Sequence, residues 1–188
     1  YESERMGVLI SQLLELARTE DVVPQMDDID FSRLVAGELL PFESVAFEKN
    51  LVLNGNVANN IHVEGNCTQL KQIVSILLDN AIKNAPGNSE VSIYYSDISN
   101  DFVTINVENI GPIILEEEKQ KIFMDGFRGK NVKSAGNGIG LYIFKEIADK
   151  YGFKLINMDL TSTFDSLVNE AEKLDDFVDS EDANINLK

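Results

Sequence analysis

The chain has 188 residues, of which 44% are hydrophobic, which suits one core with at most a small appendage. Its 16 Lys and Arg against 32 Asp and Glu give a net charge of −16, which repels nucleic acid and anionic membrane surfaces. No apolar run approaches the roughly 20 residues that cross a bilayer, and no signal peptide opens the sequence, so we expect a soluble chain with no nucleic acid partner and no direct membrane contact. The single cysteine, Cys67, is expected to be a small buried side chain in a reducing compartment.

The opening residues predict a bundle helix followed by a linker. Apolar residues recur at helical spacing over residues 1–20, at Met6, Leu9, Ile10, Leu13, Leu16 and Ala17. Such a stripe needs a partner helix to cover it. Pro24 and a cluster of acids then break the period, so residues 21–28 are predicted to be a linker.

Helical and extended patterns alternate over residues 29–160. In chain order they predict a helix over 31–47, strands over 51–57 and 61–65, a helix over 68–83, a hairpin of 89–97 and 101–109 with its turn at 99–100, one short helix within a polar stretch over 111–137, a helix over 138–152 and a strand over 153–160. This order predicts an α+β fold, in which helices cover a mixed sheet in a two-layer α/β sandwich.

The last segment, residues 161–188, is strongly acidic. Apolar residues recur in it at helical spacing, at Phe164, Leu167, Val168, Ala171, Leu174 and Val178. The pattern predicts an amphipathic helix that docks on the domain or on a neighbouring chain. A disordered tail is the alternative, and the sequence leaves both open.

Three glycines alternate just before an apolar run, at Gly136, Gly138 and Gly140. The Rossmann fingerprint needs a preceding strand, and a P-loop needs Lys and Ser or Thr after the last glycine, so neither reading fits. A loop with bare backbone N–H groups that leads into a helix start suits phosphate oxygens. A merely flexible loop is the alternative at this point.

Asn80 lies in the predicted helix over 68–83, on the same face as Ile73, Ile76, Leu77 and Asn84, and this face is expected to turn toward the core. A buried carboxamide without partners costs about 1–3 kcal/mol. Its oxygen suits Mg²⁺, which shares its coordination shell with phosphates and water, and Lys83 is close enough to reach the same ligand. A core asparagine that caps a neighbouring strand is the alternative.

Four segments in order, "LLDNAIKNAP", "VENIGPII", "KIFMDGFRGK" and "GNGIGLYIFKEI", resemble the N, G1, F and G2 boxes of the ATP-binding catalytic domain of sensor histidine kinases, in the GHKL ATPase superfamily. The resemblance covers about Ile29 to Met158. The earlier "SERMGVLISQLLELAR" is similar to the second helix of the dimerisation and phosphotransfer hairpin of that family. By this resemblance, the first hairpin helix and its phosphoacceptor histidine would be absent from the chain.

The resemblance implies ATP and Mg²⁺ as ligands. Asn80 would ligate the metal, Lys83 would contact phosphate, and Arg128 would be the cation of a mobile lid over residues 112–137. Asn109 would accept a hydrogen bond from the adenine amino group. The implied nucleotide-binding set is Asn80, Lys83, Asn84, Asn109, Gly111, Phe123, Phe127, Arg128, Gly136, Gly138, Ile139, Gly140 and Leu141.

Three residues depart from the family pattern. Asn109 replaces an aspartate and is a weaker acceptor by about 1 kcal/mol, so we expect loose nucleotide affinity. Ile113 replaces a glycine and stiffens the backbone. Ile76 stands where relatives have a second asparagine or a water-activating glutamate, which argues against an efficient ATP hydrolase.

The resemblance implies transfer of the ATP γ-phosphoryl group to a histidine on the dimerisation hairpin. It also implies a homodimer partner, a response regulator, and a cytoplasmic position within a parent protein anchored in the bacterial cell membrane. The alternative is a catalytically impaired nucleotide-binding or interaction module that regulates a partner through its bundle helix. His62, in a strand pattern, is expected to be structural or at the surface, and the charged run over 116–121 is expected to be a solvated helix face.

Overall fold

The computed structural model describes residues 25–153 except 97, 100, 101, 133, 135 and 152. The predicted N-terminal helix, the acidic C-terminal helix and the strand beyond Phe153 therefore lie outside the described residues. The described elements are, in chain order, β1 (Asp27–Asp30), α2 (Phe31–Glu48), β2 (Val52–Asn56), β3 (His62–Gly65), α3 (Cys67–Asn84), β4 (Glu90–Ser96), β5 (Thr104–Asn109), the 3₁₀ turns η1 (Glu116–Glu118) and η2 (Lys121–Phe123), and α4 (Gly140–Tyr151).

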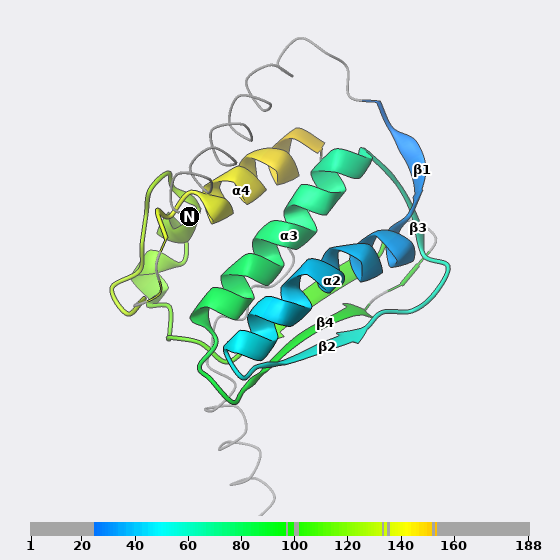
Figure 1. The fold of residues 1–188 in the computed structure, drawn as a ribbon. Coiled ribbons are helices and arrows are strands. Elements are labelled where there is room, and N and C mark those ends of the chain that lie inside the picture. The colour runs from blue at the N-terminus through cyan, green and yellow to red at the C-terminus, as the bar shows by residue number, and fades with distance from the viewer. Residues whose placement is uncertain are drawn as a thin grey trace, which may run out of the picture.

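The α-helices of the described part lie side by side over one face of a sheet, with α3 between α2 and α4 (Figure 1). The sheet has the order β2-β4-β5, in which β2 is parallel and β5 antiparallel to β4. β1 and β3 form a separate antiparallel ribbon. This arrangement confirms the predicted α+β sandwich with a mixed sheet. Among the described residues, no helix combines the length and apolar character that a membrane span needs.

The bounds of α3 follow from its flanking residues. The Asn66 side chain caps its start, where Oδ1 accepts a hydrogen bond from the Gln69 N–H at 3.1 Å. The helix ends at Asn84 because Ala85 precedes Pro86 and takes an extended conformation. Cys67, as the first helical residue, is exposed, so the prediction of a buried thiol was wrong.

β1 was not among the predicted elements. Its four residues, DDID, show no clear alternation, and their pairing with β3 defines the strand. His62 is exposed in β3, with Nδ1 3.1 Å from an Asp28 carboxylate oxygen, as expected for a surface histidine.

The polar stretch before α4 contains two short 3₁₀ turns instead of the single helix expected. Glu118, predicted to lie on a solvated face, is only 3% exposed. Its Oε1 accepts the Lys130 N–H at 3.0 Å, which ties η1 to the turn that follows η2. The prediction of a solvated face was therefore wrong for this residue, because a contact with a residue twelve positions away in sequence could not be seen locally. The same stretch carries a salt bridge of Lys130 to Glu117 at 2.8 Å, and this hydrogen bond lowers the pKa of Glu117 and raises the pKa of Lys130.

α3 contributes side chains to every hydrophobic cluster of the described residues. Leu70, Val74 and Leu78 pack toward the sheet with α2, and Ala81 and Ile82 extend that layer toward the end of the helix. On its other side, Ile73 packs with α4, and Ile76 and Leu77 lie against the same cluster. The face that carries Asn80 therefore turns toward α4, where Ile73 belongs to a cluster of buried residues.

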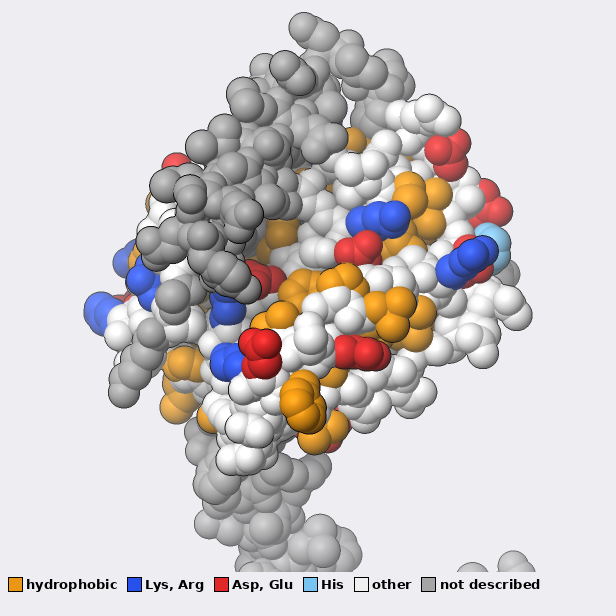
Figure 2. Space-filling model, viewed as in Figure 1, with side chains coloured by type: hydrophobic (Ala, Val, Ile, Leu, Met, Phe, Trp, Pro, Cys, Tyr) orange, Lys and Arg blue, Asp and Glu red, His pale blue; other side chains and the backbone are white. Residues whose placement is uncertain are grey.

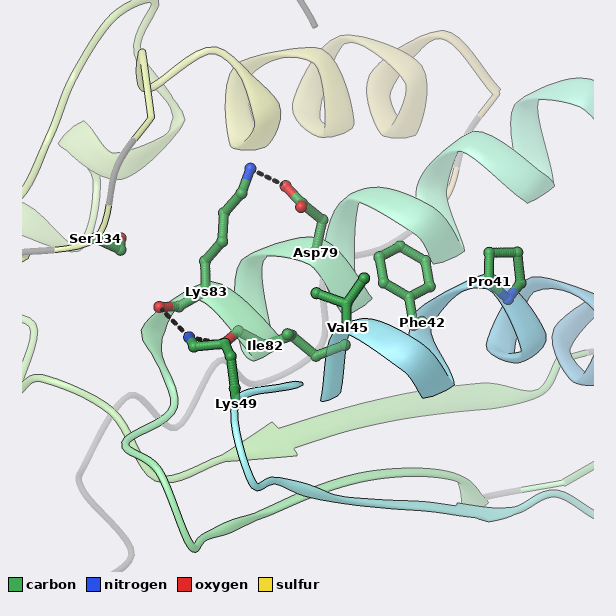
Figure 3. A pocket seen from close by; sticks show the side chains of 8 residues that line it. All are labelled: Pro41, Phe42, Val45, Lys49, Asp79, Ile82, Lys83 and Ser134. Carbon is green, nitrogen blue, oxygen red and sulfur yellow. Dashed lines mark hydrogen bonds and ion pairs between the residues drawn. The ribbon is translucent and has the colours of Figure 1, made fainter. Parts of the chain in front are cut away.

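The outer seam between α2 and α3 combines apolar and charged side chains, as the helical face in Figure 2 shows. On α2, Leu40, Val45 and Phe47 are exposed by 65%, 44% and 82%. At the end of this seam, Lys49 Nζ donates hydrogen bonds to the backbone oxygens of Ile82, at 2.6 Å, and of Lys83, at 3.1 Å (Figure 3). A cation thus occupies the negative end of α3.

We predict that Lys49→Met lowers the free energy of unfolding by about 1–2 kcal/mol, because it removes a charged cap but keeps the apolar stem. Urea denaturation followed by circular dichroism measures the change. Lys71→Met is the matched control, because Lys71 is exposed on α3, the helix that Lys49 caps, and makes no hydrogen bond or ion pair within the described part of the chain. Equal stability of the two variants would contradict the capping role.

Candidate functional site

A chain of hydrogen bonds joins the end of α3 to the segment of residues 112–137, which we call the lid. Asn84 Nδ2 donates to Asn80 Oδ1 at 3.0 Å and to the Asn80 backbone oxygen at 2.9 Å. Ser134 Oγ donates to Asn84 Oδ1 at 2.9 Å, and Arg128 Nη2 donates to the Ser134 backbone oxygen. Asn80 and Arg128, which lie far apart in sequence, are therefore connected through Asn84 and Ser134. We call these four residues the amide chain.

The lid ends in a close backbone contact that only glycine permits. Gly138 has φ +72°, and a Cβ there would overlap the Phe127 carbonyl oxygen and lie 2.8 Å from the Gly126 carbonyl carbon. Gly138, which directly follows the lid, thus packs against the backbone of Gly126 and Phe127 in the middle of the lid. Among the described residues, no hydrogen bond uses the N–H groups of Gly140 and Leu141, so the positive end of α4 is available to an anion.

An apolar floor lies beneath the lid. Phe123 and Ile139 pack against the cluster formed by Ile73 of α3 and the buried residues of α4. A Cβ at Gly140 would lie 3.7 Å from Ile76 Cγ2, so α3 and α4 meet closely at this point. The apolar packing holds the start of α4 and the base of the lid against α3.

Asn109 closes the site at the end of β5. Its Nδ2 donates to the Ile110 backbone oxygen at 2.9 Å, and no hydrogen bond among the described residues uses its Oδ1. A Cβ at Gly111 would lie 2.9 Å from Asn109 Nδ2 and 3.8 Å from the Asn84 backbone oxygen, so the absence of a side chain allows this approach. Asn109 therefore lies near Asn84 and presents an acceptor oxygen.

Lys83 lies apart from the amide chain in this structure. Figure 3 shows its side chain directed toward Asp79, with which its ammonium group forms an ion pair. The two side chains are 32% and 43% exposed. They line a cavity of about 410 Å³ together with Ser134 of the lid, with Ile82, and with Pro41, Phe42, Val45 and Lys49 from α2 and its end.

The residues present fit magnesium shared with phosphates. Among the described residues, no group of three or more His, Cys, Asp or Glu side chains could hold a metal ion. Asn80 Oδ1 accepts one hydrogen bond, and an amide oxygen has two lone pairs, so one remains for a cation. A single carboxamide ligand suits Mg²⁺, because this ion keeps several waters and takes further oxygens from substrate phosphates.

Among the residues singled out in the sequence, Asn80, Asn84 and Arg128 belong to the amide chain, and Gly111 lies near Asn84 and Asn109. Gly138 contacts the backbone of Phe127, and Gly140 lies near Ile76. Lys83 turns to Asp79 instead, and a Cβ at Gly136 would meet no heavy atom within 4 Å. Leu141 is half-buried at the start of α4. Ser134 was missed, because a single serine in a polar loop produces no pattern. The roles expected of these residues stay predictions.

An amide-bearing helix that faces a glycine-rich lid, on one layer of an α/β sandwich, defines a nucleotide-binding domain of the ATPase type. Residues 65–168 match the family model described as "Histidine kinase-, DNA gyrase B-, and HSP90-like ATPase", and the chain belongs to this family. Domains of this family bind ATP.

The chain is similar to sensor kinases. It is 29% identical to sensor protein DltS of Streptococcus agalactiae over 154 residues, which are 80% of this chain and 39% of DltS. The catalytic domain of histidine kinase ThkA is 29% identical, with a TM-score of 0.61 over 68% of this chain and 83% of that domain. ThkA in complex with the response regulator protein TrrA is 27% identical, with a TM-score of 0.57 over 68% of this chain and 37% of that one.

These similarities show that the chain is an ATPase domain of this family and that it is similar to the catalytic domains of sensor histidine kinases. The chain spans about two fifths of the length of the curated relatives that it matches, as the 39% of DltS illustrates.

We predict that Gly138→Ala disrupts the lid, because the new Cβ overlaps the Phe127 oxygen and a left-handed backbone costs an L-residue about 1–2 kcal/mol. Amide hydrogen exchange should become faster over residues 126–142. Gly136→Ala is the matched control, since its Cβ meets open space and its φ is not positive. Unchanged exchange in the Gly138 variant would show that the close contact is not required.

Proposed function

We propose that this chain binds ATP together with Mg²⁺ and transfers the γ-phosphoryl group to a histidine on a dimerisation hairpin. The amide chain is the observation that supports this proposal most directly, because its hydrogen bonds connect Asn80 to the lid cation Arg128. Family membership gives the same class of function.

In this proposal each group of residues has one task. Asn80 Oδ1 would ligate Mg²⁺, which when bound neutralises charge on the phosphates. The N–H groups at the start of α4 would bind phosphate oxygens, and Asn109 Oδ1 would accept the adenine amino group. Lys83 would leave Asp79 for phosphate, at little cost, because an exposed ion pair contributes only about 0–1 kcal/mol.

The proposed reaction needs positioning more than proton transfer. A bond forms between the histidine ring nitrogen and the γ-phosphorus, the bond from that phosphorus to the β,γ-bridging oxygen breaks, and ADP leaves. Arg128 would gather charge on the transferred group while the lid excludes water. Ile76 offers no oxygen that could activate water, which favours transfer over hydrolysis.

The same proposal implies two protein partners. A second copy of the parent protein would supply or complete the hairpin, and the phosphorylated histidine would pass its phosphoryl group to a response regulator. The complex of ThkA with the response regulator protein TrrA supports this assignment by similarity. Anchoring of the parent protein in the cell membrane stays a prediction.

A transfer assay tests the proposal. A hairpin fragment that carries a phosphoacceptor histidine is mixed with this chain, Mg²⁺ and ATP labelled at the γ-phosphate. We expect label on the hairpin, and we expect Asn80→Ala to weaken Mg²⁺-nucleotide binding by about 10- to 100-fold, because a hydrogen bond or ligand to a charged group contributes about 1.5–3 kcal/mol.

Asp27→Asn is the matched control for this assay, since Asp27 is an exposed residue of β1 outside the site. Nucleotide binding without transfer would indicate the impaired binding module instead. No binding of Mg²⁺-ATP by the unaltered chain would refute the proposal.

A further inference from the structure

We infer that Asn84 and Ser134 are positioning residues that orient the Asn80 carboxamide, so that its oxygen and not its NH₂ group faces the metal. The inference rests on the proposed function and adds two residues to it. Its basis is which group donates and which accepts in each hydrogen bond of the amide chain. These bonds begin at the Asn80 backbone oxygen and lead to the lid.

The orientation problem arises because the two ends of a carboxamide have nearly the same shape. A half-turn of the Asn80 amide would exchange Oδ1 for Nδ2 at almost no steric cost. Only the oxygen can ligate a cation, so a freely turning side chain would spend part of its time in an orientation that cannot bind metal. Some neighbour must distinguish the two ends.

Asn84 makes this distinction. One of its Nδ2 hydrogens is donated to the Asn80 backbone oxygen at 2.9 Å, and a backbone oxygen can only accept. This contact fixes the nitrogen end of Asn84 toward Asn80. The second Nδ2 hydrogen then reaches the Asn80 side chain at 3.0 Å, where it favours the oxygen, since a turned amide would set two donors against each other.

Ser134 fixes the other end of Asn84 from the lid. Its hydroxyl group donates to Asn84 Oδ1 at 2.9 Å, and Arg128 holds the Ser134 backbone oxygen. A hydroxyl group can donate or accept, so Ser134 reinforces the direction of the chain without setting it. We therefore expect that substitution of Ser134 changes magnesium-dependent nucleotide binding less than substitution of Asn84 does. The contact also links the orientation of the metal ligand to the position of the lid.

The test measures how far Mg²⁺ strengthens nucleotide binding. Isothermal titration calorimetry gives the Kd of a non-hydrolysable ATP analogue in MgCl₂ and in EDTA, and the ratio of the two values is the magnesium effect. A residue that only shapes the pocket changes both Kd values equally. A residue that orients the metal ligand changes the ratio.

We expect Asn84→Leu to reduce the magnesium effect by about 2- to 10-fold, the equivalent of one lost hydrogen bond. Ser134→Ala should reduce it by about 2-fold, and Ser134→Thr, which keeps the hydroxyl group, should restore it. Ser89→Ala is the matched control, because Ser89 lies outside the amide chain and its hydroxyl group donates a hydrogen bond to the Pro86 backbone oxygen. Asn80→Ala is the reference variant, for which we expect nearly equal Kd values in MgCl₂ and in EDTA.

The outcomes separate the two proposals. If Asn84→Leu and Ser134→Ala keep the wild-type ratio while Asn80→Ala loses it, the positioning role is refuted and the proposed function stands. If Asn80→Ala also keeps the wild-type ratio, or if Mg²⁺ does not strengthen nucleotide binding to the wild type, the proposed metal site itself is wrong. Should Asn84→Leu fail to fold, as judged by thermal melting, the pair Ser134→Ala and Ser134→Thr decides, since both changes lie in the lid.

Discussion

Burial of α3 between the sheet and its two neighbouring helices determines where the site residues point. Each large side chain that this helix buries stabilises the fold by about 1.5–3 kcal/mol, whereas a hydrogen bond of the amide chain contributes about 0.5–1.5 kcal/mol. Leu70, Val74 and Leu78 fix one face of α3 against the sheet, and Ile73 fixes another against α4. The rotation of α3 is therefore set by its apolar residues, and Asn80 and Asn84 take the direction that remains.

The ends of α3 are held by different means, and both matter for the site. Asn66 caps the start, while Pro86 stops the helix directly after the turn that carries Lys83 and Asn84. Lys49, which directly follows α2, then donates hydrogen bonds to the backbone oxygens of Ile82 and Lys83 in the last turn of α3. A helix end that frayed would move Asn84 away from Asn80, so this cap supports the amide chain.

The sequence predicted most of what depends on local periodicity and little of what depends on contacts between distant segments. α3 was expected over 68–83 and spans Cys67–Asn84, because its apolar residues repeat with the period of a helix and its end is marked by a proline. The hairpin of β4 and β5 was found from its alternation. Ser134, the buried Glu118 and β1 were missed or misread, since each is defined by a partner far along the chain. The order of four short motifs in the sequence predicted the family. The direction of the hydrogen bonds in the amide chain came from the contacts in the structure.

The meeting point of α3 and α4 constrains the chemistry as much as the amides do. Ile76 lies one helical turn before Asn80, and its Cγ2 is in contact distance of Gly140 at the start of α4. A polar side chain at this position would have to lie within an apolar cluster, where an unpaired polar group costs about 1–3 kcal/mol. Ile76 thus fills the position beside Asn80 with an apolar side chain that has no oxygen to activate water. In the proposed function the nucleophile is a histidine presented by another helix, so the site needs no group that activates water beside Asn80.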